Sequence, residues 1–200
     1  MRMLIDARQA VFQRAGVNVF APVDIELAGG SMLVVRGPNG SGKTTLLRLL
    51  AGILRPASGR VTRHATVAFL GHLAALKGDL SCRENLDFRR RFFASQGGLD
   101  NDGALSRVGL AGLGLRPARS LSAGQKRRLA LAGLLVAPRA IWLLDEPYAS
   151  LDDAGCALVD QLLGEHLGRD GAAVLSTHQR QPRVSAGSAE LRLEPGAPAT

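Results

Sequence analysis

Short apolar runs alternate with longer amphipathic segments through most of this chain. Runs of four or five apolar residues are typical of buried strands, whereas apolar positions spread over longer segments without a breaker are typical of helices. Strands are predicted on this basis at residues 32–36, 66–70, 141–144 and 172–176. Helices are predicted at residues 45–51, 83–95, 102–109, 121–136 and 154–167. The pattern as a whole predicts an α/β fold with a mixed or parallel sheet.

The first thirty residues and the C-terminal part carry shorter strand signals. Strands are predicted at residues 10–13, 17–20, 23–27, 59–61 and 190–194, the last as an edge strand. Residues 23–27 alternate strictly between apolar and polar positions, and Gly29 and Gly30 then turn the chain into the next strand. A β-rich N-terminal part is therefore expected before the α/β core.

A glycine-rich stretch between a predicted strand and a predicted helix fits the pattern Gly-x-x-x-x-Gly-Lys-[Ser/Thr] of a phosphate-binding loop. The stretch reads Gly37-Pro38-Asn39-Gly40-Ser41-Gly42-Lys43-Thr44. A turn that matches by chance is the alternative in a chain with 24 glycines. The strand before it and the helix after it are the context that the pattern requires, and they favour phosphate binding.

The residue types of this loop suit a triphosphate. Glycine lets backbone N–H groups approach the phosphate oxygens, and the start of the helix adds free N–H groups and the positive end of its dipole. Lys43 is expected to reach the β- and γ-phosphates, and the hydroxyl of Thr44 is a predicted ligand of Mg²⁺.

Asp145 and Glu146 follow the apolar strand predicted at residues 141–144. The carboxyl end of a strand is where open α/β sheets bind ligands. Asp145 is expected to hold Mg²⁺ through a water molecule, and Glu146 is expected to polarise the water that attacks the phosphate. Acidic residues of an ordinary loop are the alternative, and the phosphate-binding loop upstream favours the catalytic interpretation.

Two further segments carry weaker signals. Leu121-Ser122-Ala123-Gly124-Gln125 opens a predicted helix, where a serine is either an ordinary N-cap or part of a second phosphate site. His178 ends the predicted strand at residues 172–176 and could donate a hydrogen bond to a γ-phosphate. A lone histidine is more often a satisfied polar residue.

Composition narrows the class of protein. Two hundred residues, 46% hydrophobic and 21% charged, predict one globular domain. The net charge is +8, and the scattered arginines favour a compositional bias over attraction to nucleic acid or anionic lipid. Cys82 and Cys156 are expected to be reduced, and no Cys/His cluster has zinc-like spacing. Asp6 interrupts any signal-peptide core and no apolar run approaches membrane-spanning length, so a cytoplasmic location is expected.

The order of these motifs resembles that of the nucleotide-binding subunits of ABC transporters over nearly the whole chain. They run from the phosphate-binding loop through Leu-Ser-Ala-Gly-Gln and Asp145-Glu146-Pro147 to Ser150-Leu151-Asp152 and His178. The resemblance implies one domain over residues 1–200 of the P-loop NTPase type. It implies a RecA-like sheet core, an N-terminal antiparallel β-subdomain and a small helical subdomain at about residues 73–125 that touches a membrane subunit.

The resemblance also implies roles for residues and for a second copy. In that family two such domains face each other head to tail, with ATP between them. Ser122 and Gly124 would contact the γ-phosphate bound by the partner copy, residues 150–152 would cross the interface, and His178 would sense the γ-phosphate. The expected substrate is ATP with Mg²⁺.

Two positions depart from the family pattern. Counting back from Glu84 places His72 where the family usually has a glutamine that touches Mg²⁺ and the attacking water. The aromatic residue that usually stacks on adenine falls near Arg14, with Phe12 close by. Arginine can stack through its guanidinium plane, so both residues remain candidates.

Other segments are similar to the ATP-binding subunits of the haem exporters of cytochrome c biogenesis. They are Phe69-Leu70-Gly71-His72, Leu76-Lys77, Glu84-Asn85-Leu86, residues 142–147 and Thr177-His178-Gln179. This similarity implies haem as the cargo of the complex and integral-membrane permease subunits of the CcmB type as partners. It also implies a homodimer of ATPase subunits at the cytoplasmic face of the inner membrane.

Two other functions compete with haem export. One is an ATPase for a drug or lipid exporter, which shares every family motif. The other is an ABC protein that acts on nucleic acid, which the net charge of +8 suggests. ABC proteins that handle chromosomes carry a long coiled coil between the phosphate-binding loop and the Leu-Ser-Ala-Gly-Gln motif. Here only about 78 residues separate Lys43 from Ser122, without sustained heptads, so that insertion is missing. No nucleic-acid partner is therefore expected.

Overall fold

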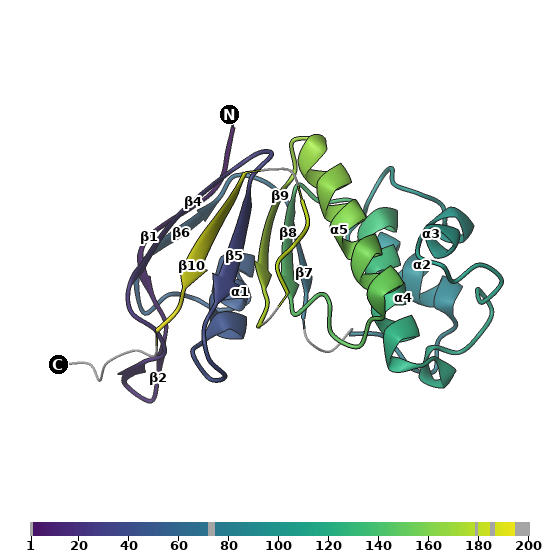
Figure 1. Cartoon of the computed structure of the whole chain (residues 1–200), viewed down its shortest axis with the longest axis horizontal. Coiled ribbons are helices and arrows are strands. Elements are labelled where there is room, and N and C mark those ends of the chain that lie inside the picture. The colour runs from purple at the N-terminus through teal and green to yellow at the C-terminus, as the bar shows by residue number, and fades with distance from the viewer. Residues whose placement is uncertain (1, 72–74, 179, 185–186, 195–200) are drawn as a thin grey trace. The chain divides into compact units, whose positions relative to one another are not determined.

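The computed structural model describes residues 2–71, 75–178, 180–184 and 187–194. The chain forms two compact units, which are described in turn (Figure 1). The first unit is built from residues 1–71, 140–147 and 160–200, and the second from residues 72–139 and 148–159. Among the described residues, no helix combines the length and the hydropathy that crossing a membrane requires.

The N-terminal part of the first unit is an antiparallel sheet, as the sequence predicts. Its strands are β1 (Met3–Val11), β4 (Val23–Ala28) and β6 (Ser58–Arg63), in the order β4-β1-β6. A short hairpin of β2 (Gln13–Arg14) and β3 (Val17–Asn18) follows β1 in the chain and forms a separate two-stranded sheet. In β4 buried and exposed residues alternate, which the sequence pattern indicates.

The first strand is longer than predicted, because β1 begins at Met3 and not at Ala10. Its apolar positions do not alternate regularly, since the register shifts between Ala7 and Ala10. Gln9 adopts a φ of 47° at this irregularity. Such a bulge breaks the period of two on which the prediction depends.

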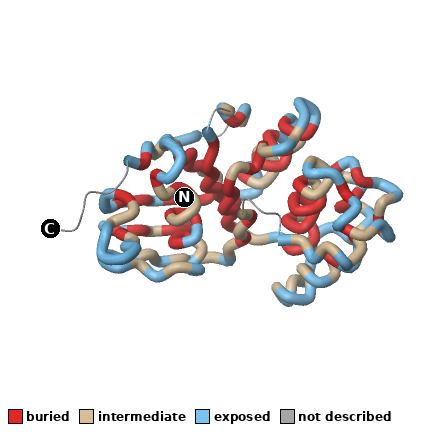
Figure 2. The backbone as a smooth tube through the Cα atoms, turned by 90° about the horizontal axis from the view of Figure 1, so that it is seen from below, coloured by how far each residue is buried: buried red, intermediate tan, exposed pale blue. Residues whose placement is uncertain are grey.

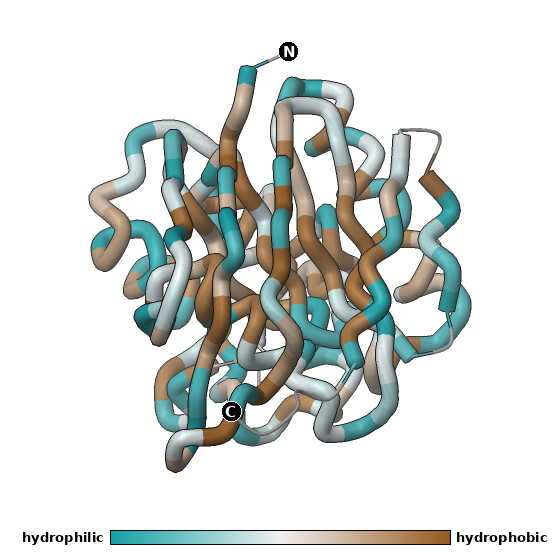
Figure 3. The backbone as a smooth tube through the Cα atoms, turned by 90° about the vertical axis from the view of Figure 1, so that its left-hand side faces the viewer, coloured by the Kyte–Doolittle hydropathy of each residue, from teal (hydrophilic) through white to brown (hydrophobic). Residues whose placement is uncertain are grey.

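The core of the first unit is a parallel sheet of five strands, in the order β10-β5-β9-β8-β7. Its strands are β5 (Met32–Arg36), β7 (Val67–Leu70), β8 (Ile141–Asp145), β9 (Ala172–Ser176) and β10 (Ser188–Arg192). Every residue of β8 and β9 is buried, as expected for central strands covered on both faces. Apolar stretches run along neighbouring strands (Figure 3). The predicted edge strand exists as β10, although it lies two residues earlier than predicted.

Helix α1 (Lys43–Ala51) supplies the apolar residues that fill the space between the two sheets. Leu46, Leu47, Leu49 and Leu50 are all completely buried, and buried residues gather in the interior of this unit (Figure 2). The helix ends at Gly52, as the sequence predicts, with a φ of 78°. Arg63 of β6 donates to the carbonyl oxygens of Leu49 and Leu50, at 2.6 Å each, and so satisfies acceptors that a helix end leaves open.

The second unit consists mainly of helices. They are α2 (Cys82–Phe92), α3 (Asn101–Arg107), a 3₁₀ turn at Ala118–Ser120 and α4 (Ala123–Val136). Helix α5 (Asp153–Gly168) begins in this unit and ends in the first. Helix α2 ends three residues before the predicted position, because Ala94 adopts a φ of 44° that a helix cannot continue. Ser81 and Glu84 form a capping box at its start.

Candidate active site

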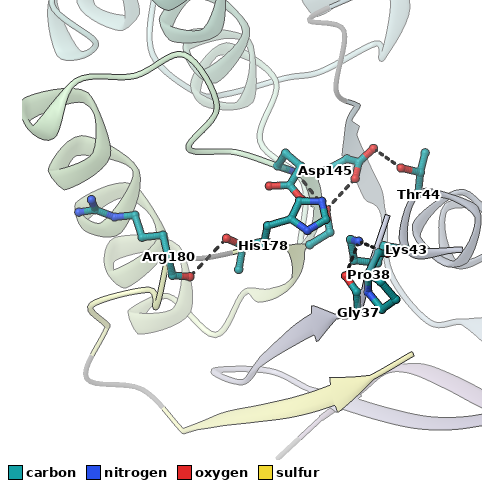
Figure 4. A network of polar contacts seen from close by, with 10 residues as sticks. Gly37, Pro38, Lys43, Thr44, Asp145, His178 and Arg180 are labelled. Atoms are coloured by element: carbon teal, nitrogen blue, oxygen red, sulfur yellow. Dashed lines mark hydrogen bonds and ion pairs between the residues drawn. The ribbon is translucent and has the colours of Figure 1, made fainter. Parts of the chain in front are cut away.

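The predicted phosphate-binding loop joins β5 to α1 in the first unit (Figure 4). The N-cap of α1 is Gly42, which has a φ of 94° and offers no side chain to the first amides of the helix. A Cβ at this position would lie 2.8 Å from side-chain carbons of Val19 and Phe20. Gly40 has a φ of 81°, and no atom of the described residues lies within 4 Å of where its Cβ would be. The loop therefore requires glycine at 42 for space and presents its outer backbone at 40.

Lys43 points back into this loop. Its Nζ donates to the carbonyl oxygens of Gly37 and Pro38, at 2.8 and 2.9 Å. Burial lowers the pKa of Lys43, and the negative charge of Glu146 opposes that shift. The ammonium is thus held at the centre of the loop, where it faces backbone acceptors.

The donor groups of the loop fit an anionic phosphate. Ser41 is completely buried, and its Oγ has no hydrogen-bond partner among the described residues. The first turn of α1 contains no acidic residue and no side-chain cap. An ammonium, an uncommitted hydroxyl and the amides at a helix start make a set of donors that is suited to phosphate oxygens.

Asp145 and Thr44 meet at the edge of this loop. The hydroxyl of Thr44 donates to Oδ2 of Asp145 at 2.7 Å, although 101 positions separate the two residues. The hydroxyl of Ser176 donates to Oδ1 of the same carboxylate at 2.6 Å. Asp145 is only 2% exposed. A hydroxyl beside a carboxylate at a phosphate site is a donor set that fits Mg²⁺, which usually takes one or two protein oxygens beside phosphates and water.

Glu146 and His178 lie next to this pair. Nε2 of His178 is 3.3 Å from Oε1 of Glu146. Burial raises the pKa of the Glu146 carboxyl, and the His178 charge is the main factor that opposes the shift. The backbone of Glu146 has a φ of 50°, an uncommon value for a residue with a side chain. The N–H of Glu146 donates to Oγ of Ser176 at 3.0 Å.

The segment that carries His178 is tied to the rest of the unit on both sides. The hydroxyl of Thr177 donates to the carbonyl oxygen of Arg180 at 3.3 Å. The guanidinium of Arg180 lies 3.5 Å from the carboxylate of Asp160 in α5. Arg36, the last residue of β5, donates to the side chain of Gln181. The strand that enters the phosphate-binding loop thus also holds the segment after His178.

Ser122 and Gly124 belong to the second unit, where Ser122 is the N-cap of α4. Its Oγ accepts from the N–H of Gln125 at 3.2 Å, and Gln125 Oε1 accepts from the N–H of Ser122 at 3.0 Å. A Cβ on Gly124 would lie 2.8 Å from the carbonyl oxygen of Ser150. Asp152 receives hydrogen bonds from Arg128 and from the N–H of Gly155. The capping role is present, and a phosphate role for Ser122 stays a prediction.

The remaining predicted residues are placed as follows. His72 lies outside the described residues. Phe12 is partly buried and packs against the core of the first unit, whereas Arg14 in β2 is exposed. The choice between them as the residue that stacks on adenine stays open.

Sequence reasoning missed one residue of this site. Ser176 is completely buried and contacts both Asp145 and Glu146. The available signal was a single polar residue at the end of an otherwise apolar strand, beside the strand that ends in Asp145.

Comparisons with known proteins show the family to which the chain belongs. Residues 20–149 match the ABC transporter family. The chain is 44% identical to cytochrome c biogenesis ATP-binding export protein CcmA 2 of Cupriavidus metallidurans, across 98% of both chains. It is 47% identical to the CcmA protein of Rhodobacter capsulatus, across 88% of this chain and 81% of that one. An inward-facing metal-chelate type ABC transporter has a TM-score of 0.80 and 28% identity, across 96% of this chain and 80% of that one.

The chain therefore belongs to the ABC transporter family, and its fold is that of an ABC nucleotide-binding domain. It is an ABC-type ATPase and binds ATP, as a subunit of a transporter. Within the family it resembles, over most of its length, the ATP-binding export proteins of cytochrome c biogenesis. The predicted membership of the ABC transporter family and the predicted similarity to the ATP-binding subunits of cytochrome c biogenesis are both confirmed.

Proposed function

We propose that this chain is the ATP-hydrolysing subunit of an export complex of cytochrome c biogenesis that moves haem, or releases it to a haem-binding partner. The observation that carries the proposal is the 44% identity to a cytochrome c biogenesis ATP-binding export protein across 98% of both chains. An exporter of drugs or lipids is the rival function, and the ATPase site alone does not distinguish the two.

The phosphates of ATP would lie in the loop of residues 37–44. Lys43 would exchange its backbone acceptors for phosphate oxygens. The buried hydroxyl of Ser41, which has no hydrogen-bond partner in the described part of the chain, would gain one. Thr44 and Asp145 would hold Mg²⁺, the latter through water. When bound, that ion would neutralise charge that develops on the phosphate oxygens.

Glu146 would act as the general base. Its carboxylate can accept a proton from the attacking water, and burial raises its pKa toward the working pH, which makes it a stronger base than an exposed glutamate. His178, 3.3 Å from that carboxylate, would hold the γ-phosphate, and in its protonated form it would favour the ionised form of Glu146. In-line transfer needs a positioned nucleophile more than covalent chemistry, so the rigid placement of Glu146 matters.

The complete site would require a second copy of the chain. Ser122 and Gly124 at the start of α4 would contact the γ-phosphate bound to the partner copy. The two copies would drive permease subunits of the CcmB type from the cytoplasmic face of the inner membrane. Their helical units would make that contact, and His72 would link it to the attacking water.

Complementation of a bacterium that lacks its own ATP-binding subunit tests the proposal. The unaltered chain, supplied with its permease subunits, should restore covalent haem on c-type cytochromes, as seen by haem staining. The Glu146→Gln variant should be produced at the same level and restore none. Full staining with Glu146→Gln would overturn the assigned base. No staining with the unaltered chain, together with ATPase activity stimulated by a drug or a lipid, would favour the rival.

A further inference from the structure

Ser176 occupies the centre of the parallel sheet. It is the last residue of β9, and it pairs with Asp145 of β8 on one side and with Val35 of β5 on the other. The strand that leads into the phosphate-binding loop and the strand that carries the acidic residues therefore both flank this position. Ser176 is completely buried, so its hydroxyl cannot exchange its partners for water.

The single hydroxyl of Ser176 is used in both directions. As a donor it contacts Oδ1 of Asp145 at 2.6 Å, and as an acceptor it receives the backbone N–H of Glu146 at 3.0 Å. A serine hydroxyl has one donor and two acceptor positions, so one oxygen atom can hold two consecutive residues at once.

Each of these contacts fixes a different feature of the site. With Oδ1 occupied, the Asp145 carboxylate is oriented so that Oδ2 faces the hydroxyl of Thr44 at 2.7 Å. With its N–H bonded, Glu146 is held at a φ of 50°, which costs free energy unless its surroundings enforce it. That backbone conformation places the carboxylate of Glu146 beside His178.

We infer that Ser176 is a positioning residue, which sets the orientation of the Asp145 carboxylate toward Mg²⁺ and of the Glu146 carboxylate toward the attacking water. This inference rests on the proposed roles of Asp145 and Glu146. Groups that orient a ligand of a metal ion by hydrogen bonds typically change metal affinity or activity by about 10- to 100-fold when they are removed.

Three variants separate positioning from general packing. Ser176→Ala removes the oxygen, and Ser176→Thr keeps a hydroxyl. Ser31→Ala is the matched control, because the Ser31 hydroxyl also donates to a carbonyl and accepts from an amide, both of Ala28, in a turn at the start of β5. Circular dichroism and thermal unfolding check that each variant is folded.

The first measurement is steady-state ATP hydrolysis. Ser176→Ala is expected to lower kcat by about 10- to 100-fold. The KM for Mg-ATP should rise in step with any loss of metal affinity, because the metal and the nucleotide bind together. Ser176→Thr should recover most of kcat, and Ser31→Ala should match the unaltered chain. The inference is overturned if Ser176→Ala keeps normal kcat, or if Ser176→Thr is as impaired as Ser176→Ala.

The second measurement does not depend on hydrolysis. Mn²⁺ bound with a non-hydrolysable ATP analogue is titrated by electron paramagnetic resonance, and Ser176→Ala should raise its Kd by about 10- to 100-fold. An unchanged Kd would contradict the inference. Should Ser176→Ala not fold, Ser176→Cys keeps the volume with a weaker donor and serves the same titration.

Failure of the proposed function and failure of the Ser176 inference would give different results. Failure of the proposed function would show in the unaltered chain, as hydrolysis that ignores Mg²⁺ or that survives Glu146→Gln. Failure of the Ser176 inference would show only in the Ser176 variants, beside a normal response of the unaltered chain and of Ser31→Ala.

Discussion

The imidazole of His166 lies parallel to the indole of Trp142, with ring centroids 4.0 Å apart and 6° between the ring planes. Trp142 lies on β8 and His166 on α5, so the stack fixes the end of a helix on the central sheet. Nε2 of His166 is also 3.2 Å from the carbonyl oxygen of Ala172. Burial lowers the pKa of His166 from 6.5 to about 4.

This stack predicts a loss of stability in mild acid. The unfolded chain takes up a proton at His166 below pH 6.5, whereas the folded protein does so only near pH 4. The contribution of the neutral, buried His166 to the free energy of unfolding is therefore fully present above pH 6.5. It falls between pH 6.5 and 4, by at most about 3 kcal/mol. Denaturant unfolding at stepped pH values measures it. His166→Phe, which keeps a ring on Trp142, should flatten this part of the profile, and parallel profiles would contradict the assignment.

Glu146→Gln is expected to separate stability from activity. Because burial raises the pKa of Glu146, the ionised carboxylate disfavours folding at pH 7, and that cost disappears only as the pH falls through the raised pKa. Glutamine keeps the shape without the charge. The thermal midpoint at pH 7 should rise by a few degrees, while ATP turnover should fall by at least about 10²-fold.

Glu165→Gln is the matched control for that experiment. Glu165 is a half-buried helix carboxylate that accepts a solvent-exposed hydrogen bond from Gln161 at 3.1 Å. Its replacement should change neither the thermal midpoint nor turnover. A lower midpoint for Glu146→Gln would show that burial of the charge does not destabilise the folded protein.

The acidic limb of the pH–rate profile is expected to depend on His178. Burial raises the pKa of Glu146 and the charge of His178 lowers it, so removing the histidine leaves the carboxyl with a still higher pKa. In His178→Ala the residual ATPase activity should therefore begin to fall at a higher pH than in the unaltered chain. His64→Ala removes an exposed histidine of the same unit and should leave the limb in place. Identical limbs in both variants would exclude this coupling.

Two glycines in helices should respond to alanine in opposite directions. A Cβ on Gly133 of α4 would lie 2.6 Å from Cδ of Arg89, whose guanidinium is largely buried beside Phe93. Gly133→Ala should destabilise the protein by about 1–3 kcal/mol. Among the described residues, a Cβ on Gly164 of α5 would meet Val184 alone, at an ordinary 3.6 Å, so Gly164→Ala should stabilise by about 0.5–1 kcal/mol. Chemical unfolding of both variants measures the two changes in the free energy of unfolding. Changes of the same sign would show that the space around each glycine does not determine the effect.

Much of the site could be predicted because it is contiguous in sequence. The loop of residues 37–44 and the acidic pair at 145–146 can be recognised because their residue types differ from the apolar runs beside them. The boundaries of β8, β9 and α4 agree with the sequence within a residue or two because turn residues or caps flank them. Residues whose role depends on a neighbour across the sheet carry no such mark, and Ser176 is one of them.

Other features depend on contacts that a linear pattern does not contain. The bulge near Gln9 follows from pairing with two flanking strands, so β1 could not be predicted in full. The shift of β10 to Ser188 follows from its register with Met32 of β5. The lowered pKa of His166 could not be predicted either, because it requires knowing that Trp142 covers the ring.

The strand order has a consequence for synthesis on the ribosome. The partners of β5 within its sheet are β9 and β10, which are made more than 130 residues later. The antiparallel sheet of β1, β4 and β6 can assemble early, but the phosphate-binding loop stays without its flanking strands until residue 192 has emerged. A product that stops before β9 and β10 would lack the strands that flank β5, so the surroundings of the phosphate-binding loop depend on residues made long after the loop itself.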